Sequence, residues 1–259
     1  MKVVILAGGL GTRLSEETVV KPKPMVEIGP EPILWHIMKI YSHFGFNNFI
    51  ICGGYKQEMI KQYFNLYSVN HSTVEFTFPP LKSTILDPPK ENWNVTVVDT
   101  GFSTMTGGRI KRIKRFVEGE NGFMLTYGDG LANINIEKLL HYHKSKKKVV
   151  TVTAVKPKGR FGALDISSDG TVTSFTEKPP GDGMWINGGF YVMEDEVFDY
   201  INGDVTVWED EPMIKLSKER KMIAYKHKGF WKPMDTMTDK RELESMWNSG
   251  NAPWKVWDK

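Results

Sequence analysis

The chain has 259 residues, of which 40% are hydrophobic and 25% charged, as is typical of one α/β domain or a domain with a small addition. Its net charge of +3 is too small to indicate a nucleic-acid or membrane partner. No apolar run approaches the ~20 residues of a membrane helix. The one cysteine, Cys52, lies in an apolar run, which excludes a disulfide framework and agrees with a cytoplasmic location.

The amino-terminal segment predicts a buried strand followed by an anion-binding loop. The strand covers residues 3–6, a short run rich in β-branched residues that glycines end. Gly8, Gly9 and Gly11 lack the Cβ atoms that would keep a ligand away from the backbone. Free N–H groups at the carboxyl end of a parallel strand form a natural site for phosphate.

Two better-known phosphate loops do not fit this segment. The Rossmann fingerprint requires a glycine where Leu14 stands, and the Walker A loop requires Gly-Lys-Ser/Thr where the chain has Gly-Thr-Arg. An ordinary glycine-rich turn would explain the glycines alone. Arg13 and Lys23 favour a phosphate site, because arginine grips phosphate oxygens in pairs and the prolines beside Lys23 stiffen its backbone.

The next hundred residues alternate between helical and strand patterns. Helices are predicted over 33–44, from 55 to about 67, from 109 to 117 and after 130, and strands over 47–52, 95–98, 123–126 and 149–155. This alternation predicts a Rossmann-like α/β fold with a mostly parallel sheet flanked by helices. Residues 68–92 interrupt the pattern and predict a hairpin followed by an extended loop, a candidate for reaching a neighbouring subunit.

The carboxyl-terminal part has a different pattern. Strands are predicted over 162–166, 171–176 and 185–193 without long helices between them, followed by helices over 208–218 and 239–247, a strand over 222–226 and a loop over 230–236. We expect one domain, 1–259, in which residues from about 156 to 259 add a smaller mixed or antiparallel subdomain and a terminal helix. The aromatic tail, with Trp254 and Trp257, is expected to dock.

Asp129 is the strongest candidate for a metal ligand. It follows an apolar strand and has a glycine on each side. A carboxylate that faces a phosphate loop is unfavourable unless a divalent cation bridges the carboxylate and the phosphates. Asp235 could supply a second ligand, and two carboxylates with phosphates suit Mg²⁺. A simple turn aspartate remains an alternative for each.

Several motifs together resemble the sugar-1-phosphate nucleotidyltransferases. The resemblance starts at LAGGLGTRLSEET and KPKP, and continues through TGGR at 106–109, YGDG at 127–130, GRFGALDI at 159–166, TEKP at 176–179, INGGF at 186–190, WEDEP at 208–212, GFWKPMDT at 229–236 and the closing APWK. Within that family the chain is similar to the enzymes that act on CTP and glucose 1-phosphate. The likeness runs nearly end to end, and residues 68–92 match least.

The resemblance implies a reaction in which CTP and α-D-glucose 1-phosphate give CDP-glucose and diphosphate, a supply of dideoxy sugars for bacterial O-antigen. It places residues 1–155 on the nucleotide side and the remainder on the sugar side. The nucleotide-binding residues that it implies are Leu6, Ala7, Gly8, Gly9, Gly11, Thr12, Arg13, Lys23, Thr106, Arg109 and Gly128. It also implies catalytic roles for Arg13, Lys23 and Asp129, sugar-phosphate binding by Glu177, Lys178, Asn187 and Gly188, and Mg²⁺ held by Asp129 and Asp235. Family likeness further suggests a homo-oligomer, with a hexamer as the expected assembly.

The chemistry is consistent with the residues that the chain offers. The phosphate of the sugar has a second pKa of ~6, so it is mostly dianionic at neutral pH and needs no general base. The main obstacle is mutual repulsion of two polyanions, which positioning and charge neutralisation overcome. Two alternatives stay open: a pyrophosphorylase for another nucleotide such as dTTP or UTP, and a nucleotide-sugar-binding protein without catalysis.

Overall fold

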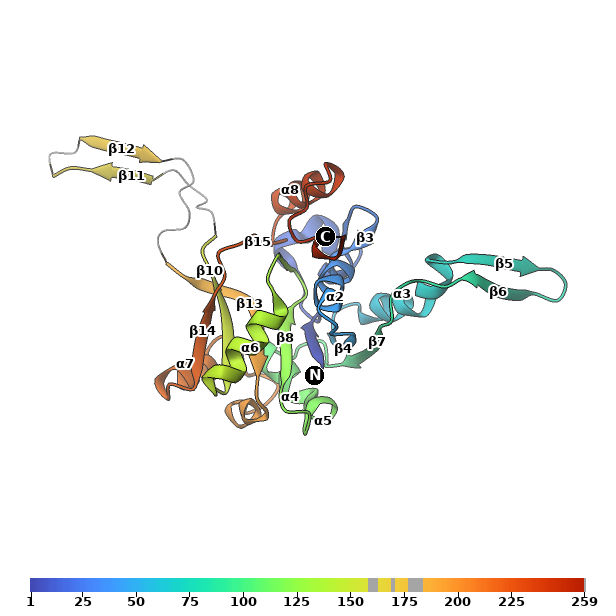
Figure 1. Cartoon of the computed structure of the whole chain (residues 1–259), viewed down its shortest axis with the longest axis horizontal. Helices are drawn as coiled ribbons and strands as arrows, with labels where there is room; N and C mark the ends of the chain where they lie inside the picture. The colour runs from blue at the N-terminus through green and yellow to red at the C-terminus, as the bar shows by residue number, and fades with distance from the viewer. Residues whose placement is uncertain (158–162, 169–170, 177–183, 259) are drawn as a thin grey trace.

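A seven-stranded sheet forms the centre of the protein (Figure 1). The computed structural model describes residues 1–157, 163–168, 171–176 and 184–258. The strand order is β14-β10-β13-β8-β1-β4-β7. Its strands are β1 (Val3–Leu6), β4 (Asn48–Gly53), β7 (Asn94–Asp99), β8 (Phe123–Tyr127), β10 (Val150–Val155), β13 (Ile186–Met193) and β14 (Met222–Lys226). Only β13 runs antiparallel to its neighbours, so the predicted mostly parallel sheet is confirmed.

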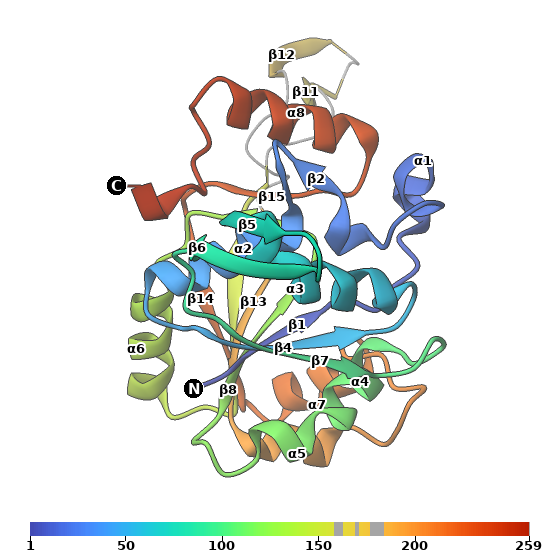
Figure 2. The ribbon, with the colours of Figure 1, turned by 90° about the vertical axis from the view of Figure 1, so that its right-hand side faces the viewer.

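Both faces of this sheet are buried, which explains the continuous apolar runs in its strands. Because side chains alternate along a strand, Val3 and Ile5 pack into one core, whereas Val4 and Leu6 pack into another on the opposite face. The molecule therefore has three layers (Figure 2). The helices that contribute buried residues to the first core are α2 (Ile33–His43), α3 (Gln57–Asn70), α6 (Ile136–Lys146) and α8 (Met237–Asn248); those on the second are α4 (Thr106–Arg112), α5 (Lys114–Val117) and α7 (Glu211–Lys218).

Small two-stranded sheets lie outside the main sheet. The hairpin predicted within residues 68–92 is confirmed, since β5 (Thr73–Thr77) and β6 (Lys82–Asp87) pair antiparallel and form an arm that projects from the body (Figure 1). A second hairpin, formed by β11 (Ala163–Ile166) and β12 (Val172–Thr176), lies on the opposite side of the view in Figure 1. Near the amino terminus, β2 (Glu27–Ile28) pairs with β3 (Glu31–Pro32), and α1 (Ser15–Thr18) follows the glycine loop.

The carboxyl-terminal part differs from the prediction in two respects. The strand expected over 185–193 is β13, which lies in the main sheet between β10 and β8 instead of with the β11–β12 hairpin. The expected loop over 230–236 contains β15 (Trp231–Pro233), which pairs with β9 (Gly130–Ala132). Both differences arise from pairing between segments far apart in sequence, which local patterns do not encode. The division of the domain at about residue 155 stays a prediction.

The aromatic tail docks as expected. Trp254 is completely buried, and its indole stacks on Phe230. Its Nε1 donates to Nδ1 of His36 at 3.4 Å, while Nε2 of His36 lies 2.9 Å from the carbonyl oxygen of Ile28. Burial lowers the pKa of His36 to about 4, so this imidazole is neutral at physiological pH. No helix among the described residues is both long enough and apolar enough to cross a bilayer.

Candidate active site

The two-stranded β9–β15 sheet places Asp129 beside Asp235. Pro233 is paired with Gly130, and the N–H of Met234 donates to the carbonyl of Asp129 at 2.8 Å. The two aspartates therefore stand at the same end of this small sheet, although 106 positions separate them in the chain. The main-chain pairing fixes their separation before any ligand arrives.

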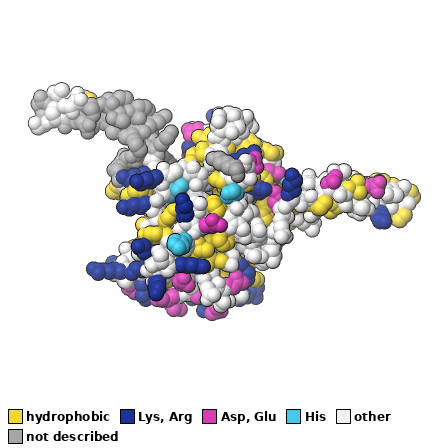
Figure 3. All heavy atoms as spheres, viewed as in Figure 1, with side chains coloured by type: hydrophobic (Ala, Val, Ile, Leu, Met, Phe, Trp, Pro, Cys, Tyr) yellow, Lys and Arg dark blue, Asp and Glu magenta, His cyan; other side chains and the backbone are white. Residues whose placement is uncertain are grey.

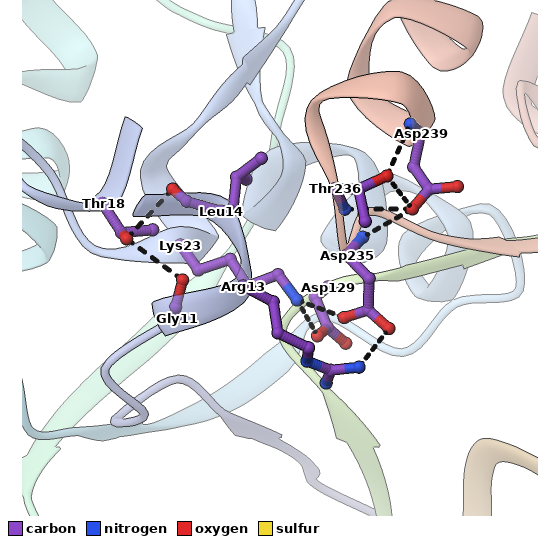
Figure 4. A network of polar contacts seen from close by, with 9 residues as sticks. All are labelled: Gly11, Arg13, Leu14, Thr18, Lys23, Asp129, Asp235, Thr236 and Asp239. Atoms are coloured by element: carbon purple, nitrogen blue, oxygen red, sulfur yellow. Dashed lines mark hydrogen bonds and ion pairs between the residues drawn. The ribbon is translucent and has the colours of Figure 1, made fainter. Parts of the chain in front are cut away.

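Two cations from the amino-terminal segment face these carboxylates (Figure 4). The Nζ of Lys23 lies 2.6 Å from Oδ2 of Asp129 and 2.7 Å from Oδ1 of Asp235. The Nη1 of Arg13 lies 2.8 Å from Oδ2 of Asp235. The side chain of Lys23 is only 10% exposed, whereas that of Arg13 is 71% exposed. We call these four residues the charge cluster; its formal charge is zero.

The start of α8 holds Asp235 rigidly. Thr236 is the N-cap residue, and its hydroxyl accepts from the N–H of Asp239 at 3.2 Å. The carboxylate of Asp239 accepts in return from the N–H groups of Thr236 and Asp235. This capping box satisfies the free N–H groups at the helix start. Lys232 anchors Asp239 from the side at 2.9 Å, so the backbone that carries Asp235 is fixed from two directions.

The glycine loop has a backbone conformation at Gly11 that favours glycine. Gly11 has a φ of 66°, and a Cβ atom there would lie 2.7 Å from a methyl group of Thr18. The Thr18 hydroxyl donates to the carbonyls of Gly11 and Leu14, both at 3.0 Å, which ties the loop to the turn that follows (Figure 4). A larger residue at position 11 would strain the backbone at this positive φ and would also clash with the Thr18 methyl group.

Arg109 lies beneath this loop and makes contacts unlike those of Arg13. It is 4% exposed. Its guanidinium donates to the carbonyls of Gly8, Gly53, Gly101 and Phe102 and to the hydroxyl of Thr100, at 2.7–3.3 Å. Burial lowers the pKa of Arg109. A Cβ atom on Gly8 would lie 2.2 Å from its Nη1, so Gly8 is a glycine because of this close approach. The geometry favours an indirect role for Arg109, as support for the loop.

A cavity of about 660 Å³ opens above the carboxyl ends of β1 and β8. That volume is within the usual range for small-molecule sites. The predicted site residues that line it are Leu6, Ala7, Gly8, Gly9, Gly11, Thr12, Arg13, Lys23, Thr106, Arg109, Gly128, Asp129, Asn187, Gly188 and Asp235. The remaining two predicted residues, Glu177 and Lys178, lie outside the described part of the chain.

Comparison with known proteins agrees with this geometry. Residues 2–239 match the family model described as nucleotidyl transferase. The glucose-1-phosphate cytidylyltransferases of Salmonella typhi and Salmonella typhimurium are each 54% identical to the chain over 258 residues, and the alignments cover 100% of both partners. The chain belongs to the glucose-1-phosphate cytidylyltransferase family.

Solved structures of more distant nucleotidyltransferase-like proteins show the same fold as this cytidylyltransferase-family chain. Apo UDP-glucose pyrophosphorylase has a TM-score of 0.69 at 17% identity, and the comparison covers 96% of this chain and 98% of the other. HddC from Yersinia pseudotuberculosis has a TM-score of 0.67 at 24% identity, over 95% and 99% of the two chains. At these identities the likeness concerns the fold alone.

The cavity of this family member also contains side chains that the sequence reasoning did not select. Tyr127 and Glu209 line it, and the Tyr127 hydroxyl donates to Glu209. Trp231 lines it too, and its indole donates to the carbonyl of Gly188 at 2.7 Å. Burial is the main cause that raises the pKa of Tyr127, so its hydroxyl remains a donor. The positions of Tyr127 in YGDG, Glu209 in WEDEP and Trp231 in GFWKPMDT were signals, because these motifs carried the resemblance.

The donor set suits Mg²⁺ in one specific way. Asp129 and Asp235 both reach the ammonium of Lys23, so their oxygens converge on one place. Among the residues that the structure describes, no group of three or more His, Cys, Asp or Glu side chains could surround a metal. Mg²⁺ commonly takes only one or two carboxylates, with phosphate oxygens and waters as its other ligands. The pair therefore fits an ion that arrives with a nucleotide.

Proposed function

We propose that this protein transfers the cytidylyl group of CTP to glucose 1-phosphate, with release of diphosphate, in a Mg²⁺-dependent reaction. Full-length identity of 54% to glucose-1-phosphate cytidylyltransferases supports the choice of substrates. The observation that carries the proposal is the charge cluster beside the glycine loop, because two cations and two carboxylates there match what a Mg²⁺-triphosphate requires.

In the proposed reaction, the glycine loop and Arg13 bind the triphosphate, and Asp129 and Asp235 hold Mg²⁺, which supplies charge neutralisation when bound. Lys23 exchanges its carboxylate partners for phosphate oxygens. Lys23 lies on a short 3-10 helix (Lys23–Met25) after Pro22, and its ammonium is already ordered by an ion pair with Asp129. The side chain therefore loses little conformational freedom when a phosphate oxygen replaces the carboxylate. The sugar phosphate attacks as a dianion, and no side chain forms a covalent intermediate.

The sugar side of the site is proposed at Asn187 and Gly188, with Glu177 and Lys178. Asn187 and Gly188 line the same cavity as the charge cluster. The Oδ1 of Asn187 accepts from the N–H of Gly189 at 2.9 Å, which orients its amide group. An ordered amide at the start of β13 is suited to bind hydroxyl groups of a sugar.

We also propose that the protein is a homo-oligomer, a hexamer by family likeness, in the cytoplasm. The β5–β6 arm supports the oligomer. On this arm the exposed fractions of Phe76, Phe78 and Leu81 are 52%, 71% and 69%, and Figure 3 shows hydrophobic side chains along it. Exposed apolar side chains grouped on a projecting arm are typical of a contact with another protein surface. Light scattering of the purified protein would give the oligomeric state.

The decisive experiment measures diphosphate release with glucose 1-phosphate and each of CTP, UTP, dTTP and GTP, with and without Mg²⁺. We expect an appreciable rate of diphosphate release only when both CTP and Mg²⁺ are present. Preference for another nucleotide would support the alternative of a different pyrophosphorylase. Binding of CDP-glucose without turnover of any nucleotide would support the non-catalytic alternative.

A further inference from the structure

A continuous chain of hydrogen bonds joins four residues that line the cavity by way of Tyr191, and none of these residues belongs to the charge cluster. It begins at Thr106, whose hydroxyl donates to Oε2 of Glu209 at 2.6 Å. The other oxygen of the same carboxylate accepts from the hydroxyl of Tyr127. Tyr127 lies 3.0 Å from the hydroxyl of Tyr191, which accepts from the amide of Asn187. The chain therefore joins the proposed nucleotide side, at Thr106, to the proposed sugar side, at Asn187.

Glu209 is the unusual member of this chain. A carboxylate repels the two polyanions that the cavity is proposed to receive, so its presence needs a structural reason. Both of its oxygens are occupied by hydroxyl donors on different elements, Thr106 at the start of α4 and Tyr127 at the end of β8. The Thr106 hydroxyl also accepts from the N–H of Trp208, a completely buried residue, so the backbone before Glu209 is anchored.

We propose that Glu209 is a positioning residue that sets the distance and orientation between the nucleotide and sugar sides of the cavity. This inference rests on the proposed function. Glu209 acts through Thr106 and Tyr127: one belongs to the nucleotide side, and the other directly precedes Gly128 and Asp129. Charged hydrogen bonds are the strong ones among side chains, so one carboxylate fixes both walls. In-line transfer requires this kind of alignment of its two substrates.

The test compares Glu209→Ala with Glu209→Gln and with a matched control. The control is Glu219→Ala, because Glu219 accepts from the hydroxyl of Tyr200 at 2.5 Å, a similar carboxylate–tyrosine bond away from the cavity residues. For Glu209→Ala we expect kcat to fall about 10- to 100-fold, with both KM values within about threefold. Glu209→Gln, which keeps one acceptor, should fall between the parent and Glu209→Ala. Glu219→Ala should match the parent.

A double variant tests the bridge itself. If Glu209 acts through Tyr127, Tyr127→Phe should lower kcat by more than about threefold in the parent. In the Glu209→Ala background the same change should lower kcat by less than about threefold. Independent, multiplicative effects would overturn the inference. So would a Glu209→Ala enzyme with kcat within threefold of the parent, or one whose thermal midpoint falls well below that of Glu219→Ala, which would make its role structural. An inactive parent in the same assay would overturn the proposed function, whereas an active parent with an unaffected Glu209→Ala variant overturns this inference alone.

Discussion

Two arginines near the glycine loop show how partners decide what a side chain can do. Arg13 makes its ion pair with Asp235 at the mouth of the cavity and is largely exposed, so phosphate oxygens can replace that carboxylate. Arg109 is buried, and its guanidinium donates to four main-chain carbonyls and to a threonine hydroxyl of the protein itself. The same side-chain type is available to a ligand in one region and committed to the fold in the other. Four predictions test this contrast.

The largest effect is expected at Asp129, whose carboxylate pairs with the same Lys23 ammonium as Asp235 does. Asp129→Asn should abolish Mg²⁺-dependent turnover, because an amide oxygen is a weaker ligand for a hard cation. Diphosphate release measured across a Mg²⁺ titration checks this. Asp87→Asn, on the projecting arm, is the control and should behave as the parent. A variant with the parent's Mg²⁺ dependence would remove Asp129 from the metal site.

Lys23→Ala should slow turnover by ~10²–10³, since a preorganised electrostatic contact to the reacting phosphates is lost. It should also lower stability, because Asp129 and Asp235 lose the cation that they share. The neighbouring Lys21, which pairs with Glu27 instead of the charge cluster, provides a matched control in Lys21→Ala. Steady-state rates and thermal unfolding are measured for both. Near-full activity of Lys23→Ala would place Lys23 outside the site.

The contrast between the arginines predicts opposite results for two equal changes. Arg109→Met removes five hydrogen bonds, three of them between buried atoms, and should cost about 2–4 kcal/mol in the free energy of unfolding. Arg13→Met should change that free energy by less than about 1 kcal/mol, because exposed ion pairs contribute little, but it should reduce turnover. Denaturant unfolding and kinetics of both variants check this. Equal losses of stability would contradict the distinction.

The smallest effect at neutral pH is expected from His36, a second polar group committed to the fold. Its pKa is about 4 in the folded protein and about 6.5 when unfolded, so the unfolded chain binds more protons between these values. The contribution of His36 to stability is therefore constant above about pH 6.5 and falls on acidification from pH 6.5 to 4.

This one histidine should contribute a slope of about 1.4 kcal/mol per pH unit in that interval. Urea unfolding across the interval should show a flatter profile for His36→Gln, whereas exposed His141 provides the control His141→Gln. A profile of His36→Gln that parallels the parent would show that His36 is not the cause.

Local sequence patterns predicted the parts of the site that lie close to one strand. The glycines after residue 6, Arg13, Lys23 and Asp129 were selected because each follows a recognisable strand or stands on stiffened backbone. The convergence of Asp129 and Asp235 depends on pairing between β9 and β15, and short segments of three residues give no detectable alternation. The position of Arg109 beneath Gly8 is also a tertiary contact, which explains why the sequence did not separate it from Arg13.

The β9–β15 pairing has a consequence for synthesis of the chain on the ribosome. Gly11 of the glycine loop is synthesised 224 residues before Asp235, which follows the strand that registers it against Asp129. A nascent chain can therefore form much of its parallel sheet while the proposed metal-binding pair, Asp129 and Asp235, is still incomplete. In the proposed mechanism turnover must wait until Asp235 has been synthesised and paired, so shorter nascent chains do not consume nucleotide.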